Sequence, residues 1–194
     1  MMKSLSQPRF YRQITLAGAF VLIGPAAILT GCDDSAIEQT QQVSSASVPG
    51  ISLEAAITQG DDHAVHAHIV AGTAVNTKSM MGDTPLHIAA AMGRPYAAEV
   101  LVGAGAELEA KNSSSVTPLF NAAFFCHGDV LKTLIDAGAD TSTTDQNGTT
   151  IQQIMETPWE QIRPIYEMVY NSIGLPFDEQ RIKSSRPKIA TMLR

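Results

Sequence analysis

Cysteine and aromatic residues are scarce in this chain of 194 residues. It holds two cysteines and one tryptophan, and aromatic residues make up only 6%, whereas hydrophobic residues reach 44%. A low aromatic content with abundant alanine favours close helix packing over a β-sandwich. Two cysteines exclude the framework of several disulfide bonds on which many small secreted domains depend. We therefore expect an all-α fold that is stabilised by apolar packing.

Positive charge is also limited, because 13 basic residues face 19 acidic ones and give a net charge of −6. This balance argues against nucleic-acid binding and against broad contact with anionic lipid, since both need a basic surface. The chain also lacks a Gly-x-Ser-x-Gly elbow, a phosphate-binding loop and a Cys-x-x-Cys pair. We expect neither an enzyme nor a cofactor.

The first 31 residues have the order of a targeting segment. An apolar stretch at 14–29, too short for a comfortable membrane span, follows the basic residues Lys3, Arg9 and Arg12. It ends in Leu29-Thr30-Gly31-Cys32, which resembles the lipobox of bacterial lipoproteins. The resemblance implies that residues 1–31 are a cleaved leader and that Cys32 carries acyl chains. Several acyl chains make a durable anchor, and they leave Cys126 as the only free thiol.

The residues that follow the lipobox bear on location. Asp33-Asp34 directly after Cys32 resembles the signal by which enteric lipoproteins avoid export to the outer membrane. The resemblance favours the inner membrane, and the outer membrane stays open as the alternative. The resemblance implies that the chain faces the periplasm and touches the membrane only through its lipid. Residues 32–49 are rich in Ser, Gln and Thr and indicate a flexible tether.

Beyond the tether, residues recur at a spacing of 33. The recurring positions are Gly72, Gly105 and Gly138; Gly60, Gly93 and Cys126; and Thr84-Pro85-Leu86 and Thr117-Pro118-Leu119. Threonine caps a helix, proline suits the first turn, and glycine ends a helix in the left-handed conformation. Each repeat thus predicts two short helices that are joined and followed by turns.

The segment Thr84-Pro85-Leu86-His87-Ile88-Ala89 resembles the ankyrin repeat. The resemblance implies an all-α ankyrin solenoid of about four repeats at 50–176, with clear repeats at 79–111 and 112–144 and degenerate caps at 50–78 and 145–176. It also implies structural roles for both Thr-Pro-Leu segments and for His87, which bridges adjacent turns. Residues 177–194 lie outside the resemblance as a basic tail. A solvated tail, a short capping helix, or a contact with an acidic partner or phospholipid all stay open there.

Two groups of side chains contain residue types that can bind a metal or act as a nucleophile. On a helix, His68 points about 200° away from His66, and it takes the position of Leu101 and Leu134 in the next repeats, so His63, His66 and His68 do not predict a metal site. Cys126 stands at a helix end where its neighbour His127 is held apart by a turn. We therefore expect no activated nucleophile.

Ankyrin repeats bind partners through their turn tips and the exposed end of the first helix, and here these positions include Met and Phe. An apolar patch rimmed by polar turns marks an interaction site. The predicted partner-binding residues are Met80, Met81, Asp83, Met92, Ser113, Ser114, Val116, Phe124, Phe125, Gln146 and Asn147. An alternative places Phe124 or Phe125 inside the core, beside Cys126.

The sequence thus indicates a lipid-anchored, monomeric binding protein. Small periplasmic ankyrin lipoproteins resemble immunity proteins that neutralise antibacterial toxins such as secreted phospholipases. They also resemble an accessory factor of periplasmic catalase. A metal-binding or stress-sensing role rests on the histidine group alone.

Overall fold

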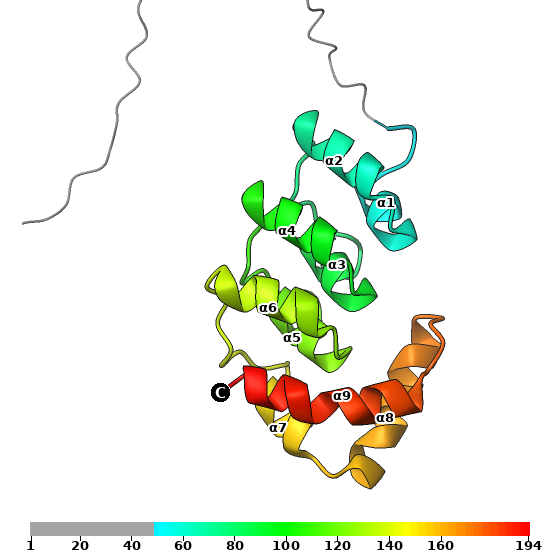
Figure 1. The fold of residues 1–194 in the computed structure, drawn as a ribbon, viewed down its shortest axis with the longest axis vertical. Coiled ribbons are helices and arrows are strands. Elements are labelled where there is room, and N and C mark those ends of the chain that lie inside the picture. Colours follow the sequence, from blue (N-terminus) through cyan, green and yellow to red (C-terminus); the bar gives the residue numbers. More distant parts are fainter. Residues whose placement is uncertain (1–48) are drawn as a thin grey trace, which may run out of the picture. The chain divides into compact units, whose positions relative to one another are not determined.

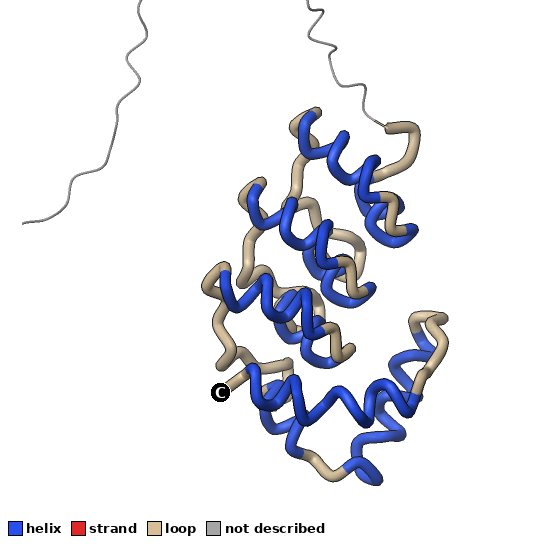
Figure 2. Tube along the Cα trace, in the orientation of Figure 1, coloured by secondary structure: helices blue, strands red, loops and turns tan. Residues whose placement is uncertain are grey.

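The computed structural model describes residues 49–194, so the predicted leader, Cys32 and all of the tether except Pro49 lie outside the described residues. The described residues form helices without a strand (Figures 1 and 2). The helices are α1 (Leu53–Gln59), α2 (Asp62–Val70), α3 (Pro85–Met92), α4 (Pro95–Gly103), α5 (Pro118–Phe124), α6 (Gly128–Asp136), α7 (Ile151–Glu156), α8 (Trp159–Ser172) and α9 (Glu179–Met192). The expected all-α solenoid is confirmed.

The first six helices stack as three pairs in two layers. Helices α1, α3 and α5 pack side by side in one layer, and α2, α4 and α6 do so in the other (Figure 1). The period of 33 sets the core, because Leu53, Leu86 and Leu119 are buried at matching positions of the first layer. Each pair buries its apolar side against the next pair, as repeat solenoids do.

The first helices begin as the recurring threonines predict. Thr84 and Thr117 have extended backbones and precede Pro85 and Pro118, the first residues of α3 and α5. The Thr117 hydroxyl accepts a hydrogen bond from the backbone N–H of Phe120 at 3.3 Å. This bond satisfies one of the donors that a helix start leaves open.

Directly after the first helices, the chain turns at residues 60, 93 and 126, where φ is +75°, +64° and +57°. A Cβ on Gly60 would lie 2.7 Å from Nη1 of Arg94, and one on Gly93 would overlap the His127 ring. Glycine at both positions suits the left-handed conformation, and at Gly93 the His127 ring also leaves no room for a side chain. Position 126 holds a cysteine at the corresponding positive φ, and its Sγ lies 3.9 Å from the Ile182 carbonyl of the C-terminal helix.

The C-terminal region leaves the period. Helix α7 continues the first layer beside α5, but α9 rather than α8 packs against α6 and α7 (Figure 1). Of the alternatives left open for residues 177–194, the structure therefore shows the capping helix, which has 14 residues. Its Ile182 and Ile189 belong to the core, so this segment is part of the folded domain.

The turns give a first testable prediction. Gly82 and Gly148 have positive φ in their turns, and Ser115 holds the same position with φ +62°. A side chain disfavours this conformation, so Ser115→Gly should raise the free energy of unfolding by about 0.5–1 kcal/mol in urea titrations. Ser113→Gly, whose φ is not positive, is the matched control and should bring no gain. Equal effects of the two substitutions would contradict the prediction.

Candidate functional site: a groove between the repeats and α8

The predicted turn tips form one continuous row. In each turn a side-chain oxygen, from Ser79, Asn112 or Asp145, accepts two backbone N–H groups of its own turn. Neighbouring turns are also joined, because Ser113 N–H donates to the Met81 carbonyl at 3.0 Å and Gln146 N–H to the Ser114 carbonyl at 3.1 Å. The tip residues Met80, Met81, Ser113, Ser114, Gln146 and Asn147 are exposed on this rigid row.

The expectation that Phe124 and Phe125 form an exposed patch is wrong. Their exposed fractions are 8% and 6%. Phe124 stacks on Tyr166 with ring centroids 4.5 Å apart, and Phe125 meets the edge of Tyr170 at 5.4 Å. Both tyrosines belong to α8, so the rings are covered because α8 folds back over the end of α5.

Val116 is also buried, whereas it was predicted as an exposed turn residue. Its carbonyl accepts a hydrogen bond from Nε2 of His87 at 3.0 Å. Nδ1 of His87 accepts from the backbone N–H of Thr84 at 3.2 Å, so Nε2 carries the ring proton. The bridging role that the resemblance implied for His87 is confirmed.

Between the turn tips, the first-layer helices and α8 lies a groove. One part has a volume of about 380 Å³ and the adjoining part about 520 Å³. The two parts adjoin, because both are lined by Ser114, Val116, Phe120, Phe124 and Val169. We call this the α8 groove.

Eight of the eleven predicted partner-binding residues line the α8 groove: Asp83, Met92, Ser114, Val116, Phe124, Phe125, Gln146 and Asn147. Met80, Met81 and Ser113 lie outside its lining. The predicted face is therefore largely brought together, although its aromatic members serve as a wall instead of an open patch.

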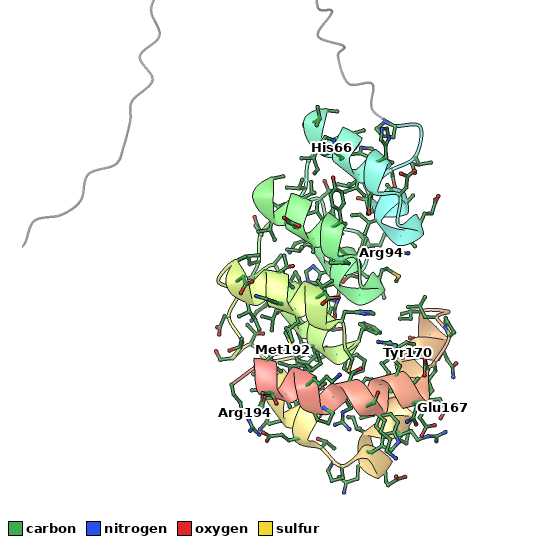
Figure 3. The ribbon with its side chains drawn as sticks, viewed as in Figure 1. His66, Arg94, Glu167, Tyr170, Met192 and Arg194 are labelled. Carbon is green, nitrogen blue, oxygen red and sulfur yellow. The ribbon has the colours of Figure 1, made fainter. Side chains whose placement is uncertain are left out.

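Helix α8 supplies the wall that the sequence interpretation missed. Ile162, Tyr166 and Tyr170 recur every four residues and are buried. Ile165, Val169 and Ile173 recur in the same way on the neighbouring side and line the α8 groove, with Ile165 45% and Ile173 43% exposed. In Figure 3, Tyr170 is on the side of α8 toward the repeats and Glu167 is on the far side. Two apolar stripes on one helix were the signal in the sequence.

The charges that line the α8 groove are those of Asp83 and Asp145, without a lysine or arginine among its lining residues. Asp83 accepts from the side-chain amide of Asn112 at 2.7 Å, and Asp145 accepts the backbone N–H groups of Asn147 and Thr149 at 2.8 and 2.9 Å. These donors are neutral, so they do not cancel the carboxylate charges. His87 in the groove stays neutral because burial lowers its pKa.

A pH-dependent stability follows from the buried His87 and the half-buried His127. Desolvation lowers the pKa of His87 and of His127, whose Nε2 donates to the Ala91 carbonyl at 3.1 Å. Histidines of the unfolded chain take up protons near pH 6.5, so stability is full above that pH and falls as the pH drops below it. Each histidine adds a slope of at most about 1.4 kcal/mol per pH unit.

The measurement is the urea midpoint between about pH 7 and pH 5. His127→Gln, which keeps a donor for the Ala91 carbonyl, should show a shallower slope than the unmodified chain. His66→Gln, at an exposed position, controls for the loss of a histidine as such. A slope that is identical in all three proteins contradicts the assignment.

The histidine group and Cys126 have the surroundings of structural residues. His68 is buried, with Nε2 donating to the Ile51 carbonyl at 2.8 Å and Nδ1 accepting from the Thr73 hydroxyl at 3.1 Å. Within residues 49–194, no three His, Cys, Asp or Glu side chains gather as a metal site would require. Burial raises the pKa of the Cys126 thiol to about 11, so it stays protonated at neutral pH.

Comparison with known proteins identifies the repeats. A family model of ankyrin repeats, in three copies, matches residues 53–145, which leaves α7, α8 and α9 outside the match. A search among curated proteins finds no match. Ankyrin repeats are protein–protein interaction modules and are typically not enzymes. Among the helices of the described region, none has both the length and the hydropathy to cross a membrane.

Proposed function

We propose that this chain, which carries ankyrin repeats at residues 53–145, binds an antibacterial toxin in its α8 groove and thereby neutralises it. One observation supports this most directly. Residues from successive turns and first-layer helices converge with α8 on a single apolar groove. A concave apolar site with a few polar groups at its rim is the usual form of a binding site.

The proposal places the protein at the periplasmic face of a bacterial membrane, anchored through Cys32. Its support is the lipobox-like segment at 29–32, and Asp33-Asp34 favours the inner membrane. A toxin that attacks the membrane, such as a secreted phospholipase, would meet the anchored protein where it acts.

Competition between sister cells tests the proposal. A strain that lacks the gene should be killed by its sister cells, and the unmodified gene should restore survival. The double variant Ile165→Asp/Met168→Asp should fail to restore it. Ile165 lines the α8 groove, Met168 is exposed beside it, and charge at these positions disrupts binding without removing core contacts. Val70→Asp, at a 60% exposed apolar residue of α2, is the matched control and should protect fully.

Full resistance of the deletion strain contradicts the toxin role. The alternative role, as an accessory factor of an envelope enzyme, is then tested by capture. The relevant partner is a protein that the unmodified chain binds and the double variant does not. Capture of an envelope enzyme such as catalase, identified by mass spectrometry, assigns the chain to that enzyme instead.

A further inference from the structure

The outer wall of the α8 groove is an apolar stripe of Ile165, Val169 and Ile173, and Met168 is an exposed apolar residue beside it on α8. Ile165, Met168 and Ile173 are 45%, 64% and 43% exposed. Ile165 and Ile173 are eight positions apart, about 12 Å along the helix axis. A stripe of this length spans two turns, so it matches apolar side chains that recur every three or four residues on another helix.

The opposite wall of the α8 groove also favours a helix as the bound segment. It consists of the first-layer helices α3 and α5, whose Met92 and Phe124 face the groove. The backbone groups inside both walls are bonded within their own helices. An extended peptide would thus bring unpaired N–H and C=O groups against apolar side chains, which is costly, whereas a helix satisfies its own backbone.

The rim of the α8 groove is negatively charged and therefore favours a partner with positive charge. Asp83 and Asp145 lie at the groove and are held by neutral donors, and the lining residues include no cation. A partner segment with lysine or arginine beside its apolar face supplies the missing opposite charge.

We infer that the α8 groove receives a basic amphipathic α-helix of the partner protein. The apolar face of this helix lies between α8 and the first-layer helices, and its lysine or arginine meets Asp83 or Asp145. The inference rests on the proposed function, because it takes the α8 groove as the binding surface.

The test is a selection of phage-displayed peptides of about twenty residues, long enough to form a helix once bound, on the full chain in lipid nanodiscs. Enriched peptides should have apolar residues at positions i, i+3 or i+4, and i+7, together with lysine or arginine. Ile165→Asp/Met168→Asp should weaken their binding at least about tenfold. Asp83→Asn should weaken it and reduce its dependence on salt, and Val70→Asp should leave it unchanged.

Several results would overturn the inference. They are the absence of any enriched peptide, enrichment of acidic or proline-containing peptides, and binding that persists in the double variant. A dimer that Ile165→Asp dissociates would assign the groove to a second copy of this chain. If the double variant fails to protect cells while no helix is selected, the proposed function stands and the inference falls. If helices bind the groove but the deletion strain survives attack, the inference stands and the toxin role falls.

Discussion

Replacing Arg186 by methionine is expected to lower the free energy of unfolding by about 3 kcal/mol. Only 6% of Arg186 is exposed, although it lies on α9 in a segment rich in basic residues. Its Nη2 atom lies 2.6, 3.0 and 2.7 Å from the carbonyl oxygens of Ile154, Met155 and Thr157. These carbonyls end α7, so the guanidinium caps that helix and meets the negative end of its dipole.

Aromatic faces complete the surroundings of this cation. The guanidinium carbon lies 5.7 Å from the ring centre of Trp159 and 5.9 Å from that of Tyr166. No salt bridge among residues 49–194 includes Arg186. Methionine keeps much of the apolar length but donates nothing, so the three carbonyls lose the guanidinium donor. The loss is costly because the contact with the Met155 carbonyl is buried.

Urea unfolding followed by circular dichroism measures the loss. Lys188→Met removes an exposed cation from the same helix and should change stability by no more than about 0.5 kcal/mol. Arg186→Lys should fall between the two, because a lysine is a point charge without the planar fork. A loss below about 1 kcal/mol for Arg186→Met would show that α7 does not depend on this cap.

The repeat stack was predictable because its signals are local. Thr84 and Thr117 start helices, Gly60 and Gly93 end them, and leucines at matching positions fill the core. Each of these residues acts within its own repeat or on the adjacent one. A pattern that recurs every 33 residues therefore determines both the helices and the order in which they pack.

The course of α8 and α9 could not be predicted in the same way, because distant residues decide it. Phe124 and Phe125 look like surface residues of a binding face until α8 covers them. Arg186 looks like a solvated residue of a basic tail, since arginine is seldom buried. Both interpretations fail because contacts between segments far apart in the sequence outweigh the local pattern. The sequence accordingly predicted the residues that the repeats contribute to the α8 groove, but not those that α8 contributes.

Phe124→Ala is expected to cost about 3–4 kcal/mol of stability. The ring packs against Phe125 at 5.3 Å and stacks on Tyr166 at 4.5 Å, so its removal leaves a cavity where α5 holds α8. Met92→Ala is the matched control, because Met92 lines the same groove near the end of α3 but is only half-buried. It should cost less than half as much, since its methylene groups are partly in water already.

Tryptophan fluorescence and circular dichroism can distinguish local unfolding of α8 from global unfolding in Phe124→Ala. Trp159 is the single tryptophan and stacks on Tyr166 at 5.9 Å, and Tyr166 in turn stacks on Phe124 of α5. The fluorescence of Trp159 therefore responds to the packing of α8 on α5, whereas circular dichroism reports mainly the repeat helices. We expect the fluorescence transition at a lower urea concentration than the dichroism transition, because α8 loses its contact with α5 while the three helix pairs keep theirs. Peptides selected on the α8 groove should then bind more weakly even where the repeats remain folded, since one wall is gone. Coincident transitions with undiminished binding would mean that α8 is held by other contacts and that Phe124 does not position the groove.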